Sequence, residues 1–150
     1  MRLTSTVTYQ GELRTVCLHL QSSSKLETDA PVDNHGKGER FSPTDLLATS
    51  LASCMLTVMG IKAQEMKIDL KQLQMEVQKI MASEPRRVSE IKLNVKIPAS
   101  LSELDNKSKT ILKKTAETCP VFNSIHPSIR VEVNWNEWAN RAGEAVERLG

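Results

Sequence analysis

FSPTDLLATSLASCMLTVMGI, residues 41–61, is the stretch that decides the fold. It opens on a helix start: Ser42 suits the N-cap, Pro43 suits the first helical position, and Asp45 lies three residues after the cap, where its side chain can reach back. The apolar residues that follow recur at spacings of three and four and therefore share one helix face: Leu47, Leu51, Cys54, Met55 and Val58. The pattern predicts a helix from residue 43 to about residue 66, with Cys54 directed into the core.

The residues before this helix read as strands followed by a loop. Strand candidates lie at residues 3–10, 13–20 and 25–28, with a turn signal at Gln10-Gly11, which predicts an antiparallel meander. Residues 29–41 are rich in Pro, Gly, Asp and Asn and predict an irregular loop, and long loops in small domains often carry function.

The residues after the helix predict a hairpin, a second helix and a final strand. Alternation at residues 73–77 and 91–97 indicates two half-buried strands with a break at 84–87. Ser102 with Asp105 repeats the capping pattern, for a helix that ends at Cys119-Pro120. A short helix from Pro120 to about residue 125 and a strand at 129–135 follow. The tail, residues 136–150, has apolar residues at helical spacing, which predicts an amphipathic helix. We expect one α+β domain over residues 1–150, in which a long helix packs on an antiparallel or mixed sheet.

Composition narrows the class of protein. Of 150 residues 25% are charged, the net charge is +2, and aromatic residues make up 3%, which disfavours a base-stacking nucleic-acid surface. The apolar stretch at 46–61 is shorter than the roughly 20 residues of a bilayer span and is interrupted by Ser and Thr. No signal peptide is visible at the N-terminus. We therefore expect a cytoplasmic protein that binds neither nucleic acid nor membrane.

Three cysteines are candidates for chemistry. They form neither a secreted disulfide framework nor a zinc-binding CxxC pair. Cys54 lies too far from the start of its helix for the helix dipole to activate it. By position alone it is either a buried core residue or a reactive thiol. Cys119 is the predicted N-cap of the helix that opens at Pro120, where backbone N–H groups favour a thiolate. Cys17 lies in a strand and reads as structural. On residues alone, Cys119 is the readier thiolate.

The stretches FSPTDLLATSLASCMLTVMGI and TAETCPVFNSI, with the layout between them, resemble the OsmC/Ohr family of organic hydroperoxide reductases. The resemblance spans residues 1–135 and is closer to the OsmC-like branch. It implies an intertwined homodimer with active sites at the subunit interface. It also implies that Cys54 attacks the peroxide and that Cys119 resolves the product as a disulfide. An external dithiol of lipoyl or thioredoxin type then reduces that disulfide, so neither a resident cofactor nor a metal is expected.

The family also uses an arginine that stabilises the thiolate and a glutamate that holds this arginine, ten residues before the helix cysteine. Thr44 occupies that position here. The candidates for the arginine are Arg14, our first choice, and Arg40, and a solvated surface role competes for each. Glu39 could position Arg40 or face water, and we favour water. We expect Thr44 and Glu39 to lie at the substrate-binding site.

Other functions compete with peroxide reduction. The change of the glutamate to Thr44 favours a non-enzymatic dimer that binds a small apolar ligand at its interface. A disulfide redox sensor would use the same two cysteines without a peroxide pocket. His35 and His126 have no second ligand at metal spacing and read as structural.

Overall fold

The computed structural model describes residues 2–139 and 144–150. It contains two compact units, Met1–Leu47 and Ala48–Gly150, and each is described by itself. The long helix α1 (Pro43–Glu65) begins at the end of the first unit and continues into the second. Our expectation that residues 1–150 form one domain stays a prediction.

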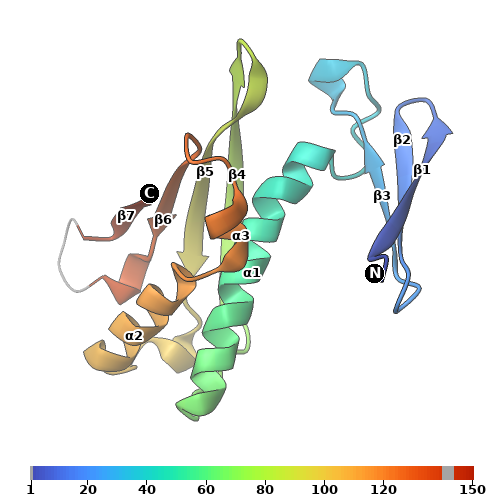
Figure 1. The fold of residues 1–150 in the computed structure, drawn as a ribbon. Coiled ribbons are helices and arrows are strands. Elements are labelled where there is room, and N and C mark those ends of the chain that lie inside the picture. Colours follow the sequence, from blue (N-terminus) through green and yellow to red (C-terminus); the bar gives the residue numbers. More distant parts are fainter. Residues whose placement is uncertain (1, 140–143) are drawn as a thin grey trace. The chain divides into compact units, whose positions relative to one another are not determined.

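The first unit is a three-stranded antiparallel meander, as predicted (blue in Figure 1). Its strands are β1 (Ser5–Gly11), β2 (Arg14–His19) and β3 (Lys25–Asp29). The turn between β1 and β2 has three consecutive residues at positive φ, beginning with Gly11 at 87°. Opposite residues of an antiparallel pair share a face, so the register Arg14↔Asp29 places these two side chains beside each other.

The loop after β3 folds back on itself and contains the short 3-10 helix η1 (Val32–Asn34). Main-chain N–H groups of Gly36 and Gly38 donate to the carbonyls of Pro31 and Ala30 at 3.0 and 3.2 Å. A Cβ at position 36 would lie 1.7 Å from the Ala30 carbonyl oxygen, so only glycine fits there. The loop is thus an ordered structure, tied to the end of β3.

The second unit has a four-stranded sheet in the order β4-β5-β6-β7. Its strands are β4 (Gln74–Ser83), β5 (Arg86–Lys96), β6 (Arg130–Asn134) and β7 (Val146–Leu149). The predicted hairpin is β4–β5, whereas β5 and β6 run parallel and β6 and β7 antiparallel. A parallel pair needs a crossover, and the chain between β5 and β6 supplies it.

That crossover holds η2 (Ala99–Leu101), α2 (Asn106–Ala116) and α3 (Pro120–Ser124). Figure 1 shows α1, α2 and α3 on one side of this sheet. Buried side chains of α1, α2 and the strands form one core between these layers. The capping prediction for α2 was wrong in one detail. Asp105 is the N-cap of α2, because it has the extended backbone that an N-cap requires and its side chain accepts from the Ser108 N–H at 3.0 Å. Ser102 instead ends η2.

The prediction of a helical tail over 136–150 was wrong for its described part. Residues 136–138 form the 3-10 helix η3 (Asn136–Trp138), and Val146–Leu149 is the edge strand β7. Trp138 contributes to the apolar pattern of the tail because its side chain is buried in the core. Its indole N–H donates to the Leu101 carbonyl at 3.2 Å. The main-chain N–H of Trp135 donates to the Ala145 carbonyl at 2.6 Å and leads into the β6–β7 pairing. Residues 140–143 of the predicted helix lie outside the described residues.

The α+β class with a mixed sheet is confirmed. By length and composition α1 could cross a membrane, a test that the core helix of a soluble protein also passes. Six residues of α1 are buried and belong to the core of the second unit. The structure describes one chain, so the homodimer stays a prediction.

Candidate functional site

The helix that carries Cys54 starts at the predicted capping box. The Ser42 N–H donates to Asp45 Oδ2 at 2.8 Å, and the Asp45 N–H donates to Ser42 Oγ at 3.1 Å. These reciprocal bonds satisfy main-chain donors that the first turn leaves unpaired. They fix where α1 begins, and therefore which residues its apolar face presents.

Cys54 lies between the buried and the exposed sides of α1. Its neighbours Leu51 and Met55 are 0% exposed, whereas Cys54 is half-buried and packs against the edge of the core. The prediction that Cys54 points into the core is thus confirmed only in part. A half-buried thiol combines apolar surroundings with access from outside.

Cys119 is the N-cap of α3, as predicted, and it is 0% exposed. Its Sγ accepts a hydrogen bond from the Phe122 N–H at 3.5 Å. The thiol of Cys54 is a second hydrogen-bonding partner, so the structure brings the two predicted cysteines together as free thiols. They come from α1 and from the start of α3, and both elements belong to the core of the second unit.

The surroundings of Cys119 oppose the expectation that its cap position favours a thiolate. Burial, followed by the hydrogen bond with Cys54, raises the pKa of Cys119 to about 11, and the opposing Phe122 N–H does not compensate. A helix of five residues supplies only a short row of N–H groups, while removal of a thiolate from water is costly. Cys119 is therefore a protonated thiol at neutral pH.

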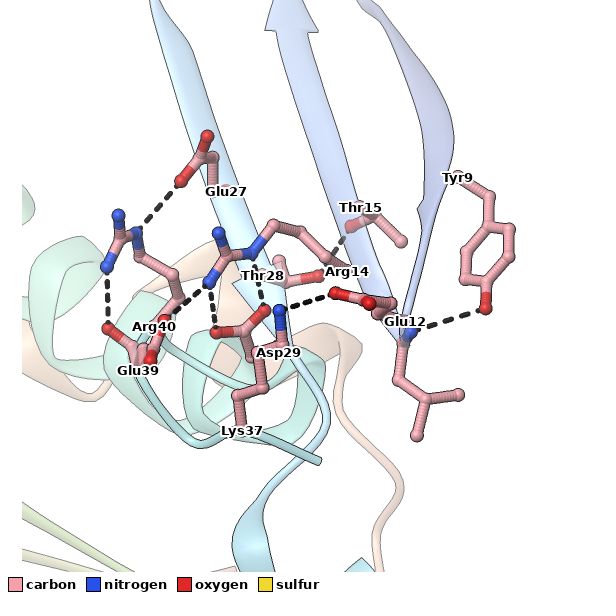
Figure 2. A network of polar contacts seen from close by, with 11 residues as sticks. Tyr9, Glu12, Arg14, Thr15, Glu27, Thr28, Asp29, Lys37, Glu39 and Arg40 are labelled. Carbon is pink, nitrogen blue, oxygen red and sulfur yellow. Dashed lines mark hydrogen bonds and ion pairs between the residues drawn. The ribbon is translucent and has the colours of Figure 1, made fainter. Parts of the chain in front are cut away.

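Arg14 lies in the first unit and is held by two carboxylates (Figure 2). Its Nε and Nη2 donate to Asp29 Oδ1 and Oδ2, both at 2.8 Å, in a bidentate pair. Nη2 also donates to Glu39 Oε2 at 3.0 Å. The hydrogen bonds from Arg14 lower the pKa of Asp29 below its usual value, although burial opposes the shift. Arg14 is thus not a solvated surface arginine.

Glu39 differs from our expectation, whereas Arg40 fits the surface role that competed for it. Glu39 is 60% exposed, yet its carboxylate binds Arg14 and not water alone, because the loop returns alongside β2 and β3. Arg40 donates from Nε to Glu27 at 2.9 Å and from Nη1 to the main-chain carbonyl of Glu39 at 3.0 Å. Both side chains of this Arg40–Glu27 pair are at least 40% exposed, which is a surface ion pair.

Thr44 lies in the first turn of α1. Its hydroxyl is within 3.2 Å of the Ser42 hydroxyl, so it takes part in the polar contacts around the helix start.

Asp29 is the residue that the sequence analysis missed. The strand register could have indicated the Arg14–Asp29 pair, since the two residues are direct cross-strand neighbours. That register depends on the whole meander and not on a local motif.

Cys17 lies on β2 opposite Val7 and Leu26, as a strand residue among apolar neighbours. His126 accepts from the Ser128 N–H at 3.1 Å, and His35 ends η1 in the left-handed region at φ 66°. Across residues 2–139 and 144–150, no group of three His, Cys, Asp or Glu side chains is placed to bind a metal ion.

The family model described as OsmC-like protein matches residues 36–134, which include α1, both thiols and the sheet up to β6. The chain belongs to the OsmC-like family. A crystal structure from Psychrobacter arcticus 273-4, provisionally described as an osmotic stress induced and detoxification response protein, is 58% identical in sequence. The match covers 89% of this chain and 95% of that one, with a TM-score of 0.84.

More distant OsmC-like structures share the fold. An organic hydroperoxide resistance protein OsmC from Legionella pneumophila is 22% identical with a TM-score of 0.64, over 89% of this chain and 96% of that one. An organic hydroperoxide resistance protein from Elizabethkingia anophelis, with thiocyanate bound, is 17% identical with a TM-score of 0.60, over 89% and 95%. No curated protein matches this chain in sequence.

Proposed function

We propose that this OsmC-like protein reduces organic hydroperoxides by a two-cysteine mechanism and serves in defence against oxidative stress. The observation that carries the proposal is the meeting of Cys54 and Cys119, two free thiols within hydrogen-bonding reach of each other. Membership of a family that includes proteins described as hydroperoxide resistance proteins supports the chemistry.

In the proposed cycle the Cys54 thiol first gives up its proton, and the thiolate sulfur attacks one oxygen of the peroxide. The S–O bond forms as the O–O bond breaks, so that the alkoxide leaves and takes up a proton to become the alcohol. Cys54 is now a sulfenic acid. The Cys119 sulfur then attacks the Cys54 sulfur, and water leaves as the disulfide forms. An external dithiol returns both cysteines to thiols and is itself oxidised to a disulfide.

The environments of the two thiols suit these roles. Cys119 is fully buried and protonated at neutral pH, so it is poorly placed to meet a peroxide but adjacent to the sulfur that it must resolve. Cys54 is the more accessible of the two. Arg14 is proposed to supply the positive charge that favours a thiolate nucleophile, with Arg40 the weaker candidate because its ion pair lies at the surface.

We further propose that the protein acts as a cytoplasmic homodimer, with a lipoyl- or thioredoxin-type dithiol as reductant and without a resident cofactor. The alternative function, a non-enzymatic dimer that binds a small apolar ligand, was favoured by the change of the family glutamate to Thr44. This argument is weaker now, because Asp29 and Glu39 supply carboxylates to Arg14. A redox sensor would use the same cysteines but would not turn over.

The test is steady-state reduction of cumene hydroperoxide with dihydrolipoamide as reductant. Cys54→Ser is expected to abolish turnover, whereas Cys17→Ser, which removes a thiol from the other unit, should retain the wild-type rate. Wild-type turnover by Cys54→Ser would refute the assignment of the nucleophile. If the wild-type protein forms the disulfide without turnover, the sensor replaces the reductase.

A further inference from the structure

A crevice of about 560 Å³ lies between helix α2 and the edge strand β7, both of which belong to the second unit. Pockets that hold small ligands measure roughly 300–1,000 Å³. Neither thiol of the Cys54–Cys119 pair lines this crevice. Its walls carry two lysines and three glutamates, from α2 and from the chain at β7: Lys113, Lys114, Glu117, Glu144 and Glu147.

Among the described residues, Lys113 is the one basic side chain that is buried, and 9% of it is exposed. Its Nζ lies 3.8 Å from Glu147 Oε1, which is too far for a hydrogen bond, and no other described residue accepts one from it. A buried ammonium group is costly unless it is paired and hydrogen-bonded. Lys113 therefore keeps N–H donors that the protein does not use, at the wall of the crevice.

Glu147 is held in place from the sheet side of the crevice. Its Oε2 accepts a hydrogen bond from the Trp135 indole N–H at 3.1 Å, and the indole is fixed because Trp135 is 1% exposed and stacks on Trp138. The other oxygen, Oε1, faces Lys113 and has no hydrogen-bond donor among the described residues. Glu147 thus presents an unused acceptor beside the unused donors of Lys113.

Glu117 adds a second carboxylate at the C-terminal end of α2. Burial, followed by repulsion from Glu147, raises the pKa of Glu117 above its usual value, and Lys114 opposes the shift without cancelling it. Two carboxylates that repel each other are stabilised by a positive group between them. Lys113 repels a divalent metal ion more strongly than a single charge, so a singly charged ammonium group suits this position better.

The mixed charge of the walls decides the class of ligand. A simple anion on Lys113 would also lie close to Glu147, so attraction and repulsion would nearly cancel. A simple cation between the two glutamates would be repelled by Lys113 in the same way. A molecule that carries both charges satisfies both walls, because its carboxylate can accept from the lysine while its ammonium group donates to the glutamates.

We propose that the crevice between α2 and β7 binds a small zwitterion of the amino-acid class, with its carboxylate on Lys113 and its ammonium group between Glu117 and Glu147. The site lies outside the thiol chemistry, so this inference goes beyond the proposed function and does not depend on it.

The test is titration of the full chain, followed by its intrinsic fluorescence. Trp135 and Trp138 are the two tryptophans of the chain, and Trp135 donates to a carboxylate of the site. The probes are L-alanine, β-alanine and 4-aminobutyrate, which differ in the separation of their charges, with acetate, methylamine and Ca²⁺ as controls of one charge sign. We expect at least one zwitterion to give a saturable change, at a concentration about tenfold or more below any control.

Variants separate this site from a general effect of solutes. Lys113→Met removes the charge but keeps a long side chain, and it should weaken zwitterion binding about tenfold or more, as should Glu117→Gln. The matched control is Lys107→Met, which changes an exposed lysine of the same helix that does not line the crevice and should bind as the wild type does. If Lys113→Met does not fold, as its melting curve will show, Glu117→Gln decides.

Three results would overturn the inference: no saturation by any zwitterion, binding of acetate, methylamine or Ca²⁺ as tight as that of the zwitterions, or wild-type affinity in Glu117→Gln. None of these measurements uses peroxide. Failure of the proposed peroxide chemistry and failure of this site are therefore told apart.

Discussion

Cys119 is expected to resist alkylation in the folded protein, and the extent follows from its surroundings. With a pKa of about 11, roughly 0.03% of Cys119 is thiolate at pH 7.5. A cysteine in an unstructured peptide, with a pKa of about 8.5, is about 9% thiolate. The ratio is about 300-fold, and the higher intrinsic nucleophilicity of a more basic thiolate offsets about 10- to 18-fold of it. Ionisation alone therefore slows Cys119 about 20-fold, and its 0% exposure slows it further.

The assay is iodoacetamide labelling of the reduced protein with an unstructured cysteine peptide in the same tube, followed by mass spectrometry of the digest. Cys119 should label at least 20-fold more slowly than the peptide in the native protein and at the rate of the peptide in urea. Native labelling within threefold of the peptide would refute the reasoning. It would mean that the thiol is neither buried nor held protonated, and that the two cysteines could exchange roles.

Three further predictions concern stability. Leu51→Ala removes a core side chain that is 0% exposed. In urea titrations it should lower the free energy of unfolding by about 2–5 kcal/mol. A loss below about 1 kcal/mol would contradict this packing. Ser42→Ala removes the side-chain acceptor of the Asp45 N–H and should lower the free energy of unfolding by about 1 kcal/mol. Helical circular dichroism should then be lost at a lower temperature, and an unchanged melting curve would argue against the cap. The pair with Arg14 lowers the pKa of Asp29, so its contribution is complete above the unfolded pKa of about 4 and is lost as pH falls through the lower folded value. Acid should therefore lower the urea midpoint of the wild type more than that of Asp29→Asn, and equal acid dependence would exclude the pair as a source of stability.

Local patterns in the sequence predicted most of the elements whose determining contacts are local, although α2 is capped by Asp105 and not by Ser102. The capping box of Ser42 and Asp45 closes within three residues, and the Cys119 cap of α3 closes on Phe122, so both follow from spacing alone. The hairpin β4–β5 followed from alternation on either side of a break. The helical spacing in the tail misled because β7 depends on pairing with β6, which no local pattern records.

The candidate site was predictable only in part for the same reason. The resemblance paired Cys54 with Cys119, and the structure brings their thiols together. The ionisation of Cys119 could not be read from its cap position, since burial depends on the complete core. Likewise, the carboxylate that holds Arg14 comes from the neighbouring strand, and a search limited to the family's glutamate position finds only Thr44.

The most direct test of the account is mass spectrometry of the reduced protein after one equivalent of cumene hydroperoxide. We predict one intramolecular disulfide between Cys54 and Cys119, with Cys17 still a thiol, and in Cys119→Ser a sulfenic acid on Cys54 that dimedone traps. If all three thiols remain unmodified, or if oxidation begins at Cys119 while Cys54 stays reduced, the proposed chemistry is contradicted.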